Sequence, residues 1–428
     1  MGGAIGIEAH AASAAPWTLR RVVTAGVIGN VLEWYDFAVY GFFAPILAAK
    51  FFPDADPRVS LLAAFVTFAV GFLMRPVGAA IFGHIGDRYG RARALIFSIA
   101  MMAVPTVLMG LLPTYETIGI AASVLIVFLR MCQGIAVGGE FTASIVFLAE
   151  KGAARRRGFF ASFSMFGATT GTMLGSAVGG LLTSVMSAEA LASWGWRAAF
   201  VSGIAVAVVG IVIRRGMFDS PSKTAVTSPL AVAFRDHGWQ VLRVLGLNVA
   251  SAATYYTIFV YAATWVSQTT TLERAVALNV TTVTILTFLV VLPCAAWLSD
   301  RFGRKLVLCV GMGSCLLLAY PLVTLMHAGV VATTAPAQMA FGALLALQMA
   351  SIPAAMTEMF PHAVRVSAVS VGYGLAYALF GGTAPAVATW LINRTGNDTV
   401  FAWYLVGLTA ISLVLALSIT DRREHPLS

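Results

Sequence analysis

The stretch "GHIGDRYGRAR" (Gly83–Arg93) occurs a second time, in altered form, as "AWLSDRFGRK" (Ala296–Lys305). Asp87 and Asp300 occupy the same place in the two copies and are 213 positions apart, almost half of the 428-residue chain. Each copy follows the second apolar segment of its own half. The repeat therefore predicts two halves that share one order of apolar segments.

These segments are long enough to cross a lipid bilayer. The chain is 59% hydrophobic and 11% charged, whereas a soluble domain is about a quarter charged. Runs of about 20 apolar residues span a membrane as helices. The sequence predicts an all-α membrane protein with twelve transmembrane helices in two pseudo-symmetric six-helix bundles. The predicted spans are 22–48, 60–83, 94–112, 118–149, 158–184, 197–213, 242–268, 275–298, 306–328, 333–357, 367–391 and 399–420.

The loops between these spans differ in their content of basic residues. One set carries twenty Lys and Arg and the alternate set carries five. Cytoplasmic loops are the ones enriched in Lys and Arg, so both termini are predicted to be cytoplasmic in a multi-pass protein of the cell membrane. The predicted divisions are an N-terminal tail (1–21), a first bundle (22–213), a cytoplasmic linker (214–241), a second bundle (242–420) and a C-terminal tail (421–428).

Several function classes lack support in this sequence. The net charge of +9 is spread over the loops between spans, which argues against nucleic-acid binding. The cysteines and histidines form no spacing typical of a metal site. No nucleophile–base pair and no Gly-rich phosphate loop can be assembled. We therefore expect neither an enzyme nor a bound cofactor or metal.

Two motifs connect the chain with known proteins. The loop Gly83–Arg93 fits the pattern G-x-x-x-D-[RK]-x-G-[RK], and its second copy departs from it only at Ala296. With "RMCQGIAVGGE" (Arg130–Glu140), it resembles the major facilitator superfamily. More narrowly, "GNVLEWYDFAVYGFFA", "WGWRAAF" and "EMFPHAVR" resemble the metabolite:proton symporter family, whose members carry proline and betaine, 2-oxoglutarate, shikimate or citrate.

This resemblance implies the major facilitator fold and uptake of a small polar metabolite together with protons, by alternating access. The metabolite would be an organic carboxylate or zwitterion. The expected partners are that small molecule, protons and the lipid bilayer, with the chain acting as a monomer. A proton-linked exporter or exchanger is the alternative, and a non-transporting membrane receptor is a further one. The repeated loops would act as gates, through Gly83, Asp87, Arg88, Gly90, Arg91, Asp300, Arg301, Gly303 and Arg304.

Five ionisable residues fall inside predicted spans, all in the first half. An ionised side chain at mid-bilayer costs about 2.5–3.5 kcal/mol or more, so each needs a reason. Three acids face two arginines, and burial disfavours the charged form of the surplus carboxyl. That carboxyl is a candidate proton carrier, although the acids could instead be structural partners of the arginines. The proton-coupling candidates are Glu33, Asp36, Glu140 and Arg130, with Arg75–Glu140 as a possible pair.

The candidate substrate contacts include polar and aromatic residues of both halves. A carboxylate would need Arg130, Arg75 or a helix N-terminus, because no second-half span carries a cation away from its ends. Tyrosines could alternatively form interfacial belts or pack between helices. Tyr256 and Tyr261 fit this structural role about as well as a substrate contact. The predicted contacts are Arg130, Arg75, Asn30, Tyr40, Asn248, Tyr255, Gln348 and Tyr377.

A row of glycines at four-residue spacing runs through the fifth predicted span, "GATTGTMLGSAVGG". Small residues at this spacing lie on one side of a helix and allow a neighbouring helix to approach closely. We expect Gly167, Gly171, Gly175 and Gly179 to serve packing rather than substrate contact.

Overall fold

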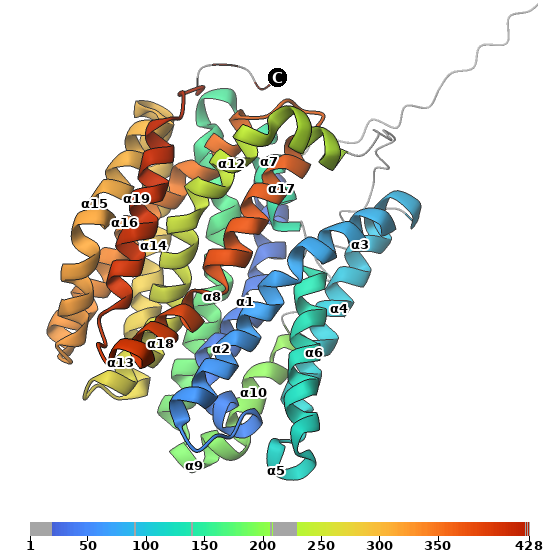
Figure 1. The fold of residues 1–428 in the computed structure, drawn as a ribbon. Coiled ribbons are helices and arrows are strands. Elements are labelled where there is room, and N and C mark those ends of the chain that lie inside the picture. The colour runs from blue at the N-terminus through green and yellow to red at the C-terminus, as the bar shows by residue number, and fades with distance from the viewer. Residues whose placement is uncertain are drawn as a thin grey trace, which may run out of the picture.

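The protein is described here from a computed structural model, which covers residues 19–89, 91–137, 140–205, 208, 229–423, 425 and 427. In these ranges every regular element is a helix (Figure 1). The first-half helices are α1 (Leu19–Phe51), α2 (Pro57–Leu73), α3 (Arg75–Tyr89), α4 (Arg91–Leu111), α5 (Tyr115–Ile118), α6 (Ile120–Ala136), α7 (Glu140–Lys151), η1 (Ala154–Arg156), α8 (Arg157–Val185), α9 (Ala188–Ala190), η2 (Leu191–Gly195) and α10 (Trp196–Val201).

The second half repeats this long-helix architecture. Its helices are α12 (Pro229–Tyr256), η3 (Thr257–Tyr261), α13 (Ala262–Thr269), α14 (Arg274–Phe302), α15 (Arg304–His327), α16 (Val331–Glu358), α17 (Arg365–Ala376), η4 (Tyr377–Gly381), α18 (Ala384–Thr395) and α19 (Phe401–Leu417). Figure 1 shows the long helices running roughly alongside one another, with the C-terminus at the end where α7, α12 and α17 lie.

Seven helical stretches of the described chain are long and apolar enough to cross a membrane. The predicted count of twelve spans is larger and stays a prediction, although the twelve ranges all fall wholly or partly on helices. The seven stretches are Pro57–Ala79, Ile120–Lys151, Arg235–Thr269, Arg274–Phe302, Arg304–His327, Val331–Glu358 and Arg365–Thr395.

The helix boundaries differ from the predicted spans in several places. The predicted span 60–83 is divided at Met74, between α2 and α3, and the span 118–149 is divided between α6 and α7. Helix α12 already begins at Pro229, within the predicted linker, and bends at His237, whose backbone is not helical (φ −129°, ψ 22°). Polar and turn-forming residues lie at these places: Arg75 and Pro76 follow Met74, and Asp236 and Gly238 flank His237.

The glycine row of α8 packs directly against α1, as the sequence predicts. A Cβ atom added at Gly171 would meet the backbone oxygen of Val31 and lie 2.9 Å from the Tyr35 nitrogen. At Gly175 it would lie 2.9 Å from the Ala38 Cβ. Only a residue without a side chain fits at such a helix crossing, and the packing prediction is confirmed for Gly167, Gly171 and Gly175. A Cβ at Gly179 would meet its nearest atoms at 3.7 Å or more, which is ordinary contact.

Candidate functional site

Two buried arginines of the first half share one aromatic neighbour. Arg75 begins α3, and its guanidinium carbon lies 4.2 Å from the ring centroid of Phe72 and 4.9 Å from that of Phe37. The guanidinium carbon of Arg130, in α6, lies 4.4 Å from Phe37 and 4.5 Å from Tyr40. Cation–π attraction of this kind strengthens when the groups are desolvated. The aromatic rings thus stabilise two cations in an interior that offers little water.

The nitrogens of these arginines are only partly hydrogen-bonded. Arg130 Nη1 donates to Gln133 Oε1 at 2.7 Å. Its Nε and Nη2, and likewise Nε and Nη2 of Arg75, are buried without a hydrogen-bond partner among the described residues. Buried donors normally find an acceptor, and exceptions call for an explanation. Each of the two arginines can therefore offer Nε–H and Nη2–H to an additional acceptor.

A chain of hydrogen bonds connects Arg130 with the predicted proton carrier Asp36. Beyond the bond to Gln133, the Gln133 Nε2 donates to Thr106 Oγ1 at 2.7 Å. Thr106 Oγ1 in turn donates to Asp36 Oδ2 at 2.8 Å. Asp36 and Arg130 make no ion pair within 4 Å in the described part of the chain. Arg130 therefore lies near an acid of α1, as expected, but the two are linked indirectly, through hydrogen bonds of Gln133 and Thr106.

The other two predicted acids differ in what the structure describes. Glu33 is buried in α1 and interacts electrostatically with Tyr256. Glu140 is the first residue of α7, and its side chain lies outside the described residues. The predicted Arg75–Glu140 pair therefore stays a prediction.

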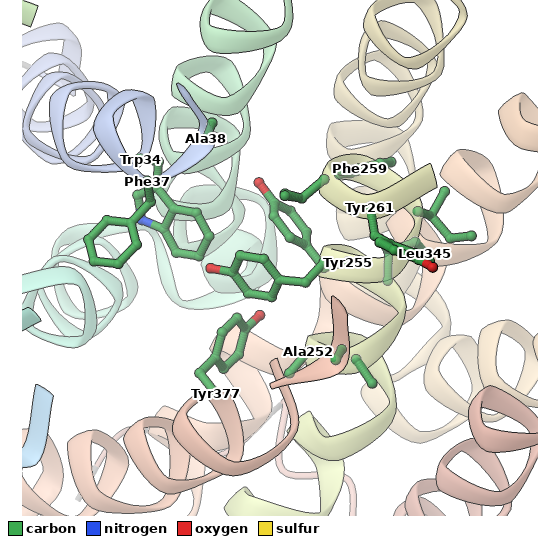
Figure 2. Close-up of a cluster of buried hydrophobic side chains, with 14 of the residues drawn as sticks. Trp34, Phe37, Ala38, Ala252, Tyr255, Phe259, Tyr261, Leu345 and Tyr377 are labelled. Atoms are coloured by element: carbon green, nitrogen blue, oxygen red, sulfur yellow. The ribbon is translucent and has the colours of Figure 1, made fainter. Parts of the chain in front are cut away.

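Aromatic side chains from both halves meet beside Arg75. Trp34 of α1 stacks on Tyr256 of α12, with ring centroids 6.1 Å apart and an interplanar angle of 15°. Its ring also contacts Tyr255 edge-on at 5.5 Å and Tyr377 edge-on at 6.3 Å. Figure 2 shows the rings of Trp34, Tyr255 and Tyr377 converging between the helices. The Arg75 guanidinium carbon lies 5.7 Å from the Trp34 centroid, so a cation and an aromatic cluster adjoin.

Three polar atoms of this cluster lack a partner within the described ranges. Trp34 Nε1, Tyr256 OH and Tyr377 OH are all buried without a hydrogen bond. In contrast, Tyr255 OH lies 2.8 Å from Thr172 Oγ1 of α8 and so links the two halves. Buried tryptophan and tyrosine usually satisfy their polar ends. The donors of Arg75, Trp34 and Tyr256 thus form a group suited to a small polar ligand.

Irregular backbone accompanies the tyrosines of the second half. The π-helix η3 directly follows Tyr256, and the π-helix η4 begins at Tyr377. A π-turn inserts one residue into an α-helix and recurs at functional sites. The extra residue rotates the part of the helix that follows it. Tyr256 and Tyr377 thus lie at the points where α12 and α17 change their helical register.

Four of the predicted substrate contacts already bind other parts of the protein. Asn30 donates to Ser144 Oγ at 3.0 Å, and Tyr40 OH donates to the Ala64 carbonyl at 3.2 Å. The side-chain amides of Asn248 and Gln348 donate to backbone carbonyls of Val244 and Gly311, at 2.7 and 3.4 Å. Asn248 Oδ1 and Gln348 Oε1 remain buried without a partner in the described chain. Their roles toward a ligand remain predictions.

A buried ion-pair network joins the two halves at the end that carries the C-terminus. Glu358 ends α16, and its Oε1 lies 3.0 Å from Nη1 of Arg157, the first residue of α8. The same oxygen lies 3.2 Å from Nη2 of Arg304, the first residue of α15. All three side chains are at most 4% exposed. Glu358 thus bridges an arginine of each half.

Asp300, a predicted gating residue, caps a helix of the opposite half. Its carboxylate accepts the backbone N–H groups of Gly158 and Phe159, at 2.9 and 2.8 Å. The first turn of a helix has unpaired N–H groups and a positive end, which a carboxylate satisfies. A further ion pair between the halves joins Arg365 to Glu150. The gating candidates Gly83, Asp87, Arg88, Gly90 and Arg91 have side chains or backbone outside the described residues.

The opposite side of the interface is held by weaker contacts. Ser176 Oγ of α8 lies 2.8 Å from Thr282 Oγ1 of α14 and donates to the Leu278 carbonyl at 3.2 Å. Arg274 donates to the backbone oxygen of Phe42. The structure therefore has contacts between the halves on both sides of the aromatic cluster.

Comparisons with known sequences and structures agree on one family. Residues 243–428 match the family described as Major Facilitator Superfamily, and residues 22–222 match the one described as Sugar (and other) transporter. The chain belongs to the major facilitator superfamily. Its transporter relatives include the glycine betaine/proline/ectoine/pipecolic acid transporter of Dickeya dadantii, 33% identical over 96% of this chain and 85% of that protein.

Other relatives span more than one substrate. The proline/betaine transporter of Escherichia coli is 31% identical, again over 96% of this chain and 85% of that protein. The shikimate transporter of the same organism is 33% identical over 95% of both chains. Among solved structures, a D-xylose-proton symporter superposes with a TM-score of 0.76 at 19% identity, covering 95% of this chain and 99% of the other. That likeness supports the major facilitator fold alone.

Sequence reasoning missed several residues of this transporter's interior. Trp34 lies between Glu33 and Asp36 in α1, and its position beside these two acids could have marked it as a site residue. Gln133 lies one helical turn beyond Arg130, a spacing that favours contact. Thr106 and Glu358 gave no comparable signal, because a threonine in an apolar span and an acid at its end are both common. No group of His, Cys, Asp or Glu suited to a metal ion occurs in the described residues.

Proposed function

We propose that this transporter takes up a small zwitterion, of the proline or betaine type, together with a proton. The observation that carries the proposal is the junction of Arg75 with Trp34 and Tyr256. It combines unpaired guanidinium donors with an aromatic cluster, so it offers complementary surfaces to the two charges of a zwitterion. The relatives named for glycine betaine, proline and ectoine support this substrate class.

The carboxylate of the substrate would bind Arg75. Nε and Nη2 of a guanidinium lie on one edge of its plane and match the two oxygens of a carboxylate. Both atoms of Arg75 are buried and unpaired within the described chain. Arg130 is less suited, because it is fully buried and its Nη1 is already bonded to Gln133. Tyr256 OH and Trp34 Nε1 could donate to the same carboxylate.

The ammonium end would lie against the rings of Trp34, Tyr255 and Tyr377. Quaternary and substituted ammonium groups bind aromatic faces through cation–π attraction, with about 0.5–2 kcal/mol per ring. A rigid arrangement of aromatic rings also loses little conformational entropy on binding. An anion such as citrate lacks the positive group that this cluster would stabilise.

Asp36 would carry the proton. It is a buried carboxyl within a membrane span, a position typical of proton relays. Hydrogen bonds through Thr106 and Gln133 connect it to Arg130, so a change in its charge would be felt by the two arginines. Proton binding at Asp36 would alter the charge balance beside the substrate, which is the requirement for coupling.

The transport cycle would be alternating access of two six-helix halves, with twelve spans, both termini cytoplasmic and one chain as the working unit. The network of Glu358, Arg157 and Arg304 would close the cytoplasmic side. The repeated Asp/Arg loops would contribute to the same gate, through Asp300 and through Asp87. The proposed direction is import together with the proton, and proton-linked export or exchange is the alternative.

The test is uptake into proteoliposomes of a labelled panel: glycine betaine, proline, shikimate, 2-oxoglutarate and citrate. We expect glycine betaine or proline to accumulate only with an inward proton gradient. Trp34→Leu should weaken their binding about 5- to 30-fold. The exposed Trp390 supplies a matched control, and Trp390→Leu should leave binding unchanged. Preferential uptake of shikimate or citrate would overturn the zwitterion assignment.

A further inference from the structure

The Thr106 hydroxyl occupies an unusual position between three groups. It lies 2.8 Å from Asp36 Oδ2 and 2.9 Å from the backbone oxygen of Met102, one helical turn earlier in α4. It also accepts a hydrogen bond from Gln133 Nε2 at 2.7 Å. A threonine hydroxyl has one proton and two lone pairs. It can therefore donate to Asp36 or to Met102, but not to both at once.

We infer that Thr106 is a two-position hydroxyl switch that keeps Asp36 hydrogen-bonded in both protonation states. This inference rests on the proposed function of Asp36 as the proton carrier. When Asp36 is ionised, Thr106 donates to the carboxylate. When Asp36 is protonated, its O–H donates to Thr106 Oγ1, and the Thr106 proton turns to the Met102 carbonyl.

The hydrogen bonds balance in both states. With Asp36 ionised, Thr106 Oγ1 donates to Oδ2 and accepts from Gln133. With Asp36 protonated, Oγ1 donates to Met102 and accepts from both Gln133 and Asp36, which uses its two lone pairs. The proton itself comes from water and adds to a carboxylate oxygen, and no other covalent bond changes. Since an unpaired buried polar group is unfavourable, this arrangement lowers the free-energy cost of changing the protonation state of Asp36.

The surroundings of Asp36 make Thr106 its main hydrogen-bonding partner. In the described part of the chain, the titratable groups that interact with this carboxyl are Arg130 of α6 and Tyr35 of α1. From α4, Thr106 supplies the hydroxyl. Gly203, which follows α10, lies beside the other carboxylate oxygen: a Cβ added there would be 3.1 Å from Asp36 Oδ1. This neighbour carries no charge and no side-chain donor. Tyr35 OH is itself engaged, since it donates to the Ala199 carbonyl at 3.1 Å.

The experiment compares Thr106→Val, which keeps the shape but removes the hydroxyl, with Thr106→Ser, which keeps the hydroxyl. Purified protein in proteoliposomes is assayed for glycine betaine or proline uptake across a pH series, for proton movement with an internal pH dye, and for substrate exchange. Loss of a donor disfavours ionised Asp36. In Thr106→Val, the midpoint of proton-driven uptake should therefore move about half a unit to one unit to higher pH.

Exchange should persist in Thr106→Val, because it needs no net proton movement, and Thr106→Ser should match the parent. Thr284→Val is the control, since Thr284 is equally buried and donates to the Val280 carbonyl four residues earlier. A parent-like profile in Thr106→Val, with the parent coupled to protons, would overturn the switch alone. Uptake by the parent without proton movement would instead overturn the proposed function, and the switch with it.

Infrared difference spectra of the parent, taken between acid and alkaline pH, give a readout that does not depend on how well Thr106→Val folds. The band of protonated Asp36, identified by its loss in Asp36→Asn, should have the frequency of a carboxyl that donates a hydrogen bond. A band of a carboxyl without a hydrogen bond would overturn the inference.

Discussion

Arg75 and Arg130 share the ring of Phe37, yet their remaining contacts differ. Arg130 is joined through Gln133 and Thr106 to Asp36. Arg75 adjoins Trp34, whereas Nε and Nη2 of both arginines have no hydrogen-bond partner in the described chain. Two cations beside one another repel, and a bound carboxylate would relieve that repulsion. In the proposed mechanism, Arg75 would bind the substrate and Arg130 would take part in proton coupling.

Arg75→Lys separates charge from geometry. Lysine keeps the positive charge but cannot form a bidentate contact with a carboxylate. The affinity for glycine betaine or proline should fall at least about tenfold, or about 1.4 kcal/mol, as measured by tryptophan fluorescence or calorimetry on purified protein. Arg394, the exposed basic residue in the last turn of α18, provides the control. An Arg75→Lys affinity within about twofold of the parent would contradict carboxylate binding by this residue.

At the scale of single residues, the sequence predicts which charged side chains belong to the candidate site, but not which residues they contact. Five ionisable residues inside apolar spans can be recognised from the sequence as functional candidates, because a charge facing lipid is energetically costly. Their pairing depends on helix rotation and depth. Asp36 and Arg130 could be expected to lie near each other, but the intervening Thr106 and Gln133 are ordinary residues in apolar segments.

Among the helices, α8 shows most directly how sequence spacing becomes packing. Its glycines admit α1 at backbone contact, and its Thr172 reaches Tyr255 in the other half. Four-residue spacing predicts a packing face on α8, but it does not identify α1 as the helix that packs there. The π-turns η3 and η4 were not predicted. All five residues of η3 are buried, so no alternation of polar and apolar residues marks the inserted residue there.

Gly171→Ala tests that packing. The added Cβ would meet the backbone of Val31 and Tyr35, which cannot move aside as a side chain can. We expect destabilisation of about 1–3 kcal/mol, seen as a lower midpoint of thermal unfolding in detergent. A Cβ at Gly407 of α19 would meet nothing within 4 Å, so Gly407→Ala should be neutral or slightly stabilising. Equal midpoints for the two variants would refute a packing role for the glycine row.

For the molecule as a whole, the two ends of the interface between the halves are unequal. Buried ion pairs hold the end with the C-terminus, whereas hydroxyl contacts and Arg274 hold the other. The repeated loop and the basic-residue bias predicted two related halves with a charged gate. They did not predict Glu358, which becomes a bridge only when α8, α15 and α16 are assembled.

Glu358→Gln should loosen this gate. Removing the charge leaves Arg157 and Arg304 buried with less compensation, which disfavours the closed arrangement by about 3 kcal/mol. Hydrogen–deuterium exchange at the start of α8 and the end of α16 should accelerate, and net uptake should fall. Glu116→Gln alters a solvent-exposed partner of Lys50 and should change neither quantity. Unchanged exchange in Glu358→Gln would remove this residue from the gate.

The hydrogen-bonded chain that ends at Asp36 also has an electrical consequence. If one carboxyl carries one proton and the substrate is a neutral zwitterion, each inward cycle transfers one positive charge. A membrane voltage of 100 mV, negative inside, then supplies about 2.3 kcal/mol per cycle, enough for a roughly 50-fold concentration ratio without any pH difference. Electrodes on a solid-supported membrane should record an inward current on substrate addition, and Asp36→Asn should abolish it. The voltage alone would then let a cell retain its solute when the external medium turns alkaline.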